Sequence, residues 1–200
     1  MDSNALHKLT YGLFLLTASE NGFDNGCIIN TAVQVASSPT RIAISVQKNN
    51  KTHDMILNTR LFNISSITTS AGFDLFKHFG MQSGREINKF EDYSDVARSS
   101  NNLLYLTKAA NMYLSAKVVE HTDLGSHTLF IAEVTDAQIL SDETSCTYDY
   151  YHSNIKPKPD TGEKHSWVCT VCGYVYEGEE IPDDFECPWC HHPKSDFVKK

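Results

Sequence analysis

The chain has 200 residues and a formal net charge of −8, with 25 acidic residues against 17 basic ones. An acidic chain of this kind does not favour nucleic acid as a partner, and no apolar stretch is long enough for a membrane-spanning helix. The first residues are polar and do not resemble a secretory leader, so we expect a cytoplasmic protein without a membrane partner.

Residues 1–152 are predicted to form a mainly β domain. The segments rich in Val, Ile, Thr and aromatic residues lie at 11–19, 26–37, 41–48, 62–68, 112–121 and 126–140, and helices are expected at 52–59 and 71–79. This number of strands indicates a β-barrel rather than a parallel α/β fold. No G-x-G-x-x-G motif follows a strand, so a Rossmann dinucleotide site is absent from the pattern.

Short motifs occur in a fixed order over residues 5–152. They are NGCIINT at 25–31, SSP at 37–39, THD at 52–54, FKHFG at 76–80, SGR at 83–85 and GSHTLF at 125–130. Together they resemble the flavin reductase-like, FMN-binding split-barrel family. The resemblance implies a homodimer of Greek-key barrels, with FMN at the subunit interface and NADH or NADPH as the donor, NADH being favoured.

Candidate phosphate-binding residues follow from charge and from a helix start. An acidic chain must place cations for the FMN phosphate, and Lys48, Arg85 and Lys89 are the candidates. The polar turn at 48–53 leads into a predicted helix N-terminus, where backbone N–H groups favour an anion. Further candidates in these segments are Asn49, Asn50, Thr52, His53, Ser83 and Gly84. An ordinary helix cap and a solvated loop are the alternatives.

The family resemblance assigns the remaining flavin residues. It implies that Asn30 and Thr31 run beside the isoalloxazine, and that Ser37 and Ser38 follow at the ribityl chain. It also implies that His127 lies near the flavin, where it contacts the reduced nicotinamide or the phosphate as the candidate catalytic residue. Ser126 stands where the family commonly has Asp, so a packed strand histidine remains the alternative.

Residues 153–166 are polar and rich in Pro and Lys, which predicts a linker before a second domain at 167–200. That domain contains two C-x2-C knuckles, formed by Cys169 with Cys172 and by Cys187 with Cys190. Four thiolates on two tight turns form a tetrahedral site that suits zinc or a single iron. The spacing predicts a metal site without deciding between these metals.

The residues around the knuckles favour iron. Gly173 allows the first knuckle to fold back, so that backbone N–H groups can point at sulfur. Aromatic residues surround the motif at 167, 174, 176, 185, 189 and 197, and such a shell keeps water from a metal. The pattern W-x-C-x-x-C-G-Y-x-Y followed by C-P-x-C resembles rubredoxin, with a shorter gap between the knuckles than in free-standing rubredoxins.

The two resemblances together imply an electron-transfer protein. A nicotinamide delivers two electrons as a hydride, whereas one Fe(Cys)4 centre accepts a single electron, and FMN can connect the two. Fused proteins of this kind, called high-molecular-weight rubredoxins, are implied to serve flavodiiron or rubrerythrin-type partners that remove oxygen, peroxide or nitric oxide. Two alternatives remain: a non-enzymatic carrier, and a flavin-binding barrel with a structural zinc ribbon for docking.

Overall fold

Seven antiparallel strands form the main sheet of the protein. The computed structural model describes residues 9–157, 166–171, 173–188 and 192–199. The strands are β1 (Phe14–Glu20), β2 (Phe23–Ile29), β3 (Ala32–Ser37), β4 (Thr40–Gln47), β5 (Leu61–Ile67), β8 (Ala110–Asp123) and β9 (His127–Ile139). Their order in the sheet is β2-β1-β5-β8-β9-β4-β3. The mainly β class that the sequence predicts is confirmed.

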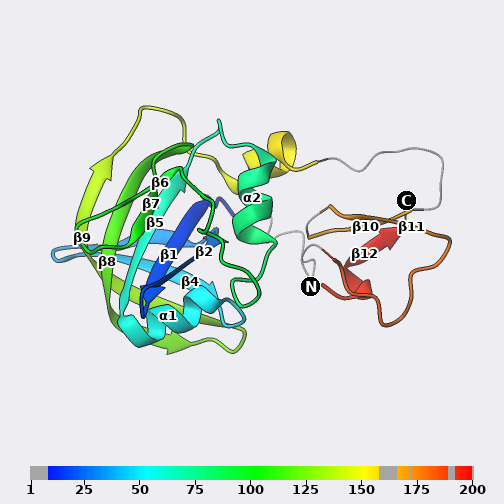
Figure 1. Cartoon of the computed structure of the whole chain (residues 1–200), viewed down its shortest axis with the longest axis horizontal. Helices are drawn as coiled ribbons and strands as arrows, with labels where there is room; N and C mark the ends of the chain where they lie inside the picture. Colours follow the sequence, from blue (N-terminus) through cyan, green and yellow to red (C-terminus); the bar gives the residue numbers. More distant parts are fainter. Residues whose placement is uncertain (1–8, 158–165, 172, 189–191, 200) are drawn as a thin grey trace.

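The sheet curls around a shared apolar interior (Figure 1). Long antiparallel strands twist, and the twist lets one face of the sheet enclose a core. Leu16, Ile44, Phe62 and Phe130 point into this core from four different strands, and each is fully buried. Burial of one such side chain contributes about 1.5–3 kcal/mol, so this interior is the main source of the barrel's stability.

The segment predicted as one strand at 26–37 is two strands in the structure. β2 ends at Ile29 and β3 begins at Ala32, and these strands lie at opposite edges of the sheet. The chain therefore crosses the open side of the barrel at Asn30 and Thr31. Apolar residues continue on both sides of this crossing, so the local pattern does not reveal it.

The two predicted helices are confirmed. α1 (Lys51–Thr59) buries Met55 and Ile56 against the barrel interior. It ends at Arg60, which adopts a left-handed conformation with φ 63° while its N–H donates to the carbonyl of Ile56. α2 (Phe73–Gly80) contributes to a second apolar cluster on the side of the barrel.

Two short helical elements follow the barrel strands. In α3 (Tyr148–Tyr150) the Thr147 hydroxyl accepts a hydrogen bond from Tyr150 N–H, and η2 (Tyr151–Ile155) continues the chain as a π-helical turn. The ring of Tyr151 is buried, and its centroid lies 4.5 Å from that of Phe76 in α2. The predicted boundary at residue 152 thus falls inside an element that packs with the barrel.

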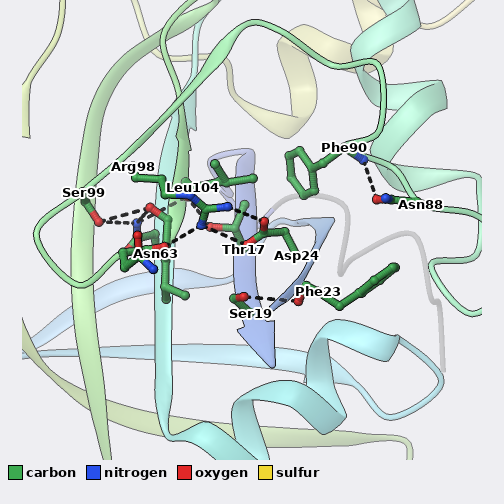
Figure 2. Close-up of polar contacts among 12 residues, drawn as sticks. Thr17, Ser19, Phe23, Asp24, Asn63, Asn88, Phe90, Arg98, Ser99 and Leu104 are labelled. Carbon is green, nitrogen blue, oxygen red and sulfur yellow. Dashed lines mark hydrogen bonds and ion pairs between the residues drawn. The ribbon is translucent and has the colours of Figure 1, made fainter. Parts of the chain in front are cut away.

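A hairpin of β6 (Val96–Arg98) and β7 (Leu104–Leu106) was not predicted, because each strand has only three residues. A polar network fixes it to the barrel (Figure 2). Asn63 Nδ2 donates to Ser99 Oγ at 2.8 Å and to the Leu104 carbonyl at 3.3 Å, and Arg98 pairs with Asp24 at 2.7 Å. Buried polar groups need such partners, so the network determines where the hairpin packs.

The C-terminal part of the chain, residues 166–199, is named the metal module below. Its strands β10 (Ser166–Cys169), β11 (Val175–Glu177) and β12 (Phe197–Lys199) form a small sheet in the order β11-β10-β12, and η3 (Lys194–Asp196) precedes the last strand. Cys169, Ile181, Cys187 and Phe197 form its buried centre. None of the helices among the described residues has the length and apolarity needed to cross a membrane.

Candidate functional site

The N-terminus of α1 is the centre of the candidate flavin site. Asn50 precedes the helix in an extended conformation, and its side chain makes no capping hydrogen bond. The first N–H groups of a helix have no partner within the helix, and the helix dipole favours an anion at this end. His53 N–H donates to the Asn50 carbonyl at 3.1 Å. The start of α1 therefore lacks a side-chain cap, and the phosphate site that the sequence predicts for the segment with Asn49 and Asn50 stays a prediction.

The loop at residues 83–85 closes over this helix start. Gly84 is buried against the side chain of Asn25, which itself donates to Thr52 Oγ1 at 3.0 Å. Arg85 donates from Nη2 to Asp54 at 2.6 Å and from Nε to the Asn49 carbonyl at 3.3 Å. These contacts place the guanidinium of Arg85 beside the first turn of α1, so two predicted segments come together.

A chain of polar contacts runs from Arg85 into the barrel. Asp54 also contacts His53 Nδ1 at 3.0 Å, and His53 Nε2 lies 2.8 Å from Thr128 Oγ1. His53 is buried, so these contacts fix its ring. Burial alone would raise the pKa of Asp54, but hydrogen bonds from His53 and Arg85 outweigh it and lower this pKa below 3.8. The carboxylate therefore stays ionised and orients both partners.

The start of β9 lies next to the same helix. Lys48 N–H donates to the Ser126 carbonyl at 3.0 Å, and Lys48 Nζ pairs with Asp123 at 2.6 Å. His127 is paired with Gln47 across the sheet, and its Nδ1 lies 2.9 Å from Ser126 Oγ. Ser126 thus partly replaces the expected carboxylate as a partner for His127. The structure brings His127 and Lys48 to the end of the barrel that also holds the start of α1.

Lys89 lies elsewhere. Lys89 is only 2% exposed, and its ammonium donates to the carbonyls of Gly26 and Phe79, both at 2.9 Å. Burial lowers the pKa of Lys89, which the nearby Cys27 opposes. The side chain connects β2 to α2 and is directed into the protein, so it does not join Arg85 at the helix start.

The four residues that the family resemblance assigns to the isoalloxazine and ribityl chain lie at the two ends of β3. Asn30 and Thr31 are half-buried at the start of β3, and Thr31 Oγ1 donates to Asn30 Oδ1 at 3.0 Å. The pairing of Ala32 with Ile44 places this start near the end of β4, which leads into Lys48. Ser37 and Ser38 are exposed at the other end of β3, about 17 Å further along the strand. They therefore do not lie between Asn30 and α1.

Three residues that connect the site are absent from the predictions made from the sequence. Asn25 contacts Gly84 and donates to Thr52. Asp54 is bound to both His53 and Arg85, and Thr128 Oγ1 contacts the other ring nitrogen of His53. The first two belong to motifs that the sequence already singles out, at 25–31 and 52–54. The contact to Thr128 spans 75 positions, so no local pattern could have found it.

Two of the four cysteines of the candidate metal centre lie within the described residues. Cys169 and Cys187 are buried in the same cluster, lined by Trp167, Tyr174, Tyr176 and Phe185. Gly173 has φ 85°, and its N–H donates to the Cys169 carbonyl at 2.9 Å, as a tight knuckle requires. Cys172 and Cys190 lie outside the described residues. Two buried thiols within an aromatic shell fit the soft ligand set of a rubredoxin-type metal.

Two family models match the chain. The flavin reductase-like domain matches residues 6–158, and the rubrerythrin, rubredoxin-like domain matches residues 167–198. Most of the chain is therefore covered by one family or the other, in the order that the sequence predicts.

Individual proteins are similar to this chain over all or most of its length. The chain is 34% identical to the high molecular weight rubredoxin of Moorella thermoacetica, over 98% of this chain and 99% of that protein. It is also 34% identical to a ferric-chelate reductase (NAD(P)H) of Archaeoglobus fulgidus, over 79% of this chain and 93% of that protein. Among solved structures, the flavin reductase PheA2 is 26% identical, with a TM-score of 0.58 over 72% of this chain and 90% of that one. The chain therefore belongs to the flavin reductase-like family and carries a C-terminal rubredoxin-like domain.

Proposed function

We propose that the protein is an NAD(P)H-dependent flavoprotein oxidoreductase that passes electrons through a rubredoxin-type iron site to a partner protein. The observation that carries this proposal is the presence of both domains on one chain, a flavin reductase-like domain and a rubredoxin-like domain. The two domains together support flavin-dependent electron transfer. FMN as the flavin and NADH as the favoured donor are the finer parts of the proposal.

The start of α1 is proposed to bind the FMN phosphate. Backbone N–H groups of the first turn and the Arg85 guanidinium supply donors and positive charge there. Asp54 holds the guanidinium in place, and Lys48 adds a second cation at the same end of the barrel. Asn30 and Thr31 would lie along the isoalloxazine, and His127 would contact the nicotinamide.

Cys169, Cys172, Cys187 and Cys190 are proposed to hold one iron. When bound, the iron supplies a one-electron couple. The aromatic residues around Cys169 and Cys187 exclude water from the site, and this protects the thiolates from exchange and oxidation. A flavodiiron or rubrerythrin-type protein is the proposed acceptor.

The flavin domain is proposed to form a homodimer. Val33 and Val35 are more than half exposed on β3, and β3 is an edge strand of the sheet. Exposed apolar side chains on an edge strand favour association with another chain. Size-exclusion chromatography with light scattering would give twice the mass of one chain, and a monomer at micromolar concentration would contradict this part.

Anaerobic stopped-flow mixing with NADH tests the function. The iron-loaded protein should lose flavin absorbance first and iron–thiolate absorbance second, because the hydride donor cannot reduce the iron site directly. Cys169→Ser should keep the flavin phase and lose the iron phase, together with electron delivery to an added acceptor protein. Unchanged delivery by this variant, or a native protein that contains zinc and no iron, would refute the electron relay.

A direct measurement separates the enzyme from a passive carrier. NADH oxidation by the purified protein should exceed the background oxidation by free FMN under the same conditions. A rate equal to that background would support the carrier, in which another reductase loads the flavin.

A further inference from the structure

Lys156 reaches from the flavin domain to the metal module. Its Nζ donates to the carbonyls of Val171 at 2.8 Å and Thr170 at 3.2 Å, and both carbonyls belong to the first cysteine knuckle. A Cβ added to Gly173 would lie only 3.2 Å from Lys156 Cε and 3.4 Å from the Pro157 carbonyl. The glycine of the knuckle thus permits this close approach, in addition to the positive φ that the turn requires.

Met81 provides a second contact between the two parts of the chain. It is partly buried against the centre of the metal module, which contains Cys169, Ile181 and Cys187. Met81 directly follows α2, and Figure 1 shows α2 on the side of the barrel that faces the module. An apolar contact and a charged contact therefore join the module to the flavin domain.

The two contact residues lie at the ends of two elements that pack against each other. Met81 is the C-cap residue of α2, and Lys156 is the C-cap residue of η2. The contact between the rings of Phe76 and Tyr151 holds these two elements together, and both rings are buried. We name Met81, Lys156 and the packed ends of α2 and η2 the docking platform.

We propose that the docking platform binds the metal module against the flavin domain, and that Lys156 raises the reduction potential of the iron in this docked state. The inference rests on the proposed iron site and deepens it by assigning the module a defined docking position. The module thus has a preferred position on the flavin domain, which a freely flexible linker at 153–166 would not give it.

The docking position lies close to the candidate flavin site along the chain. Met81 packs on the module, and Arg85 lies at the start of α1. Five residues can span no more than about 18 Å when fully extended. The backbone at Met81, where the module packs, therefore lies within about 18 Å of the backbone at Arg85, beside the phosphate end of the proposed flavin site.

The sign of the potential change follows from charge. Reduction adds one negative charge to a tetrathiolate iron site, and a cation beside the knuckle stabilises that extra charge. Removal of the ammonium should therefore disfavour the reduced form. We expect the ratio of reduced to oxidised iron at a fixed potential to fall about threefold to tenfold, where tenfold corresponds to about 59 mV for one electron.

A spectroelectrochemical titration of the iron-loaded protein measures this change. Lys156→Met should lower the midpoint potential, while Lys156→Arg should keep a value close to the wild type because the charge remains. Lys117→Met is the matched control, since Lys117 is exposed on β8 of the barrel. Equal potentials in Lys156→Met and the wild type, or an equal decrease in Lys117→Met, would overturn the assigned role of Lys156.

Small-angle X-ray scattering of the same full-length proteins tests the docking itself. The double variant Met81→Asp/Lys156→Met should show a larger maximum dimension than the wild type, while Met81→Leu should match the wild type. An unchanged profile for the double variant would overturn the docking platform. This measurement needs neither NADH nor an acceptor, so it remains decisive even if the proposed electron transfer fails.

Discussion

Gly84→Ala is predicted to weaken FMN binding with little effect on the barrel. An added Cβ would lie 2.5 Å from Asn25 Nδ2 and 2.6 Å from Asn25 Cγ, and closer still to Oδ1. Asn25 is 1% exposed, so its side chain has little room to move. Either the loop at 83–85 shifts outward, or Asn25 rotates and loses its hydrogen bond to Thr52.

The size of the effect follows from these two routes. Overpacking of a buried contact costs about 1–3 kcal/mol, and loss of one hydrogen bond adds about 1 kcal/mol. Outward movement of the loop avoids this cost but displaces Arg85 from the start of α1. A hydrogen bond to a charged group contributes about 1.5–3 kcal/mol, so loss of about 2 kcal/mol of contact between Arg85 and the phosphate weakens FMN binding about 30-fold, because 1.4 kcal/mol corresponds to a tenfold change.

Fluorescence titration of the apoprotein with FMN measures this affinity, and thermal melting reports the stability. Gly72→Ala is the control, because a Cβ at Gly72 meets no atom within 4 Å. The double variant Asn25→Ala/Gly84→Ala removes the obstructing amide and should recover part of the affinity, so the two changes should not be additive. Wild-type affinity in Gly84→Ala would refute the placement of this loop at the flavin site.

Three further predictions concern the barrel. Asp54→Asn should be less stable than the wild type at neutral pH. Because folding lowers the pKa of Asp54, the stability it contributes is present above its unfolded pKa of about 3.8 and is lost as the pH falls through the lower folded pKa. Melting curves of the two proteins should therefore converge in acid, and a constant difference would contradict the pairing with Arg85. Burial raises the pKa of Cys146 to about 11 and also raises the pKa of Cys27. Mass spectrometry should therefore find both thiols unmodified by iodoacetamide at pH 8 in the folded metal-loaded protein, and rapid labelling would contradict their burial. Phe62→Ala should reduce the free energy of unfolding by about 3–5 kcal/mol in denaturant titrations, and a loss below 1 kcal/mol would contradict its position in the core.

The candidate site was predictable where a short motif contains its own chemistry. The THD motif predicts a helix start with polar side chains, and Thr52 and His53 do lie there. Lys89 shows the limit of this reasoning, since a lysine in a polar segment has the same sequence signature whether its ammonium faces solvent or two buried carbonyls. Only packing distinguishes these two environments.

The sequence by itself determined the class of the fold and the rubredoxin-like nature of the C-terminal part, and it predicts a soft metal site there, because strand periodicity, linker composition and C-x2-C spacing are local properties. The tertiary structure decided which distant residues meet. It placed Thr128 on His53, Gly84 on Asn25 and Lys156 on the first cysteine knuckle. These contacts depend on how strands and helices pack across the whole chain, and no short window of sequence encodes that arrangement.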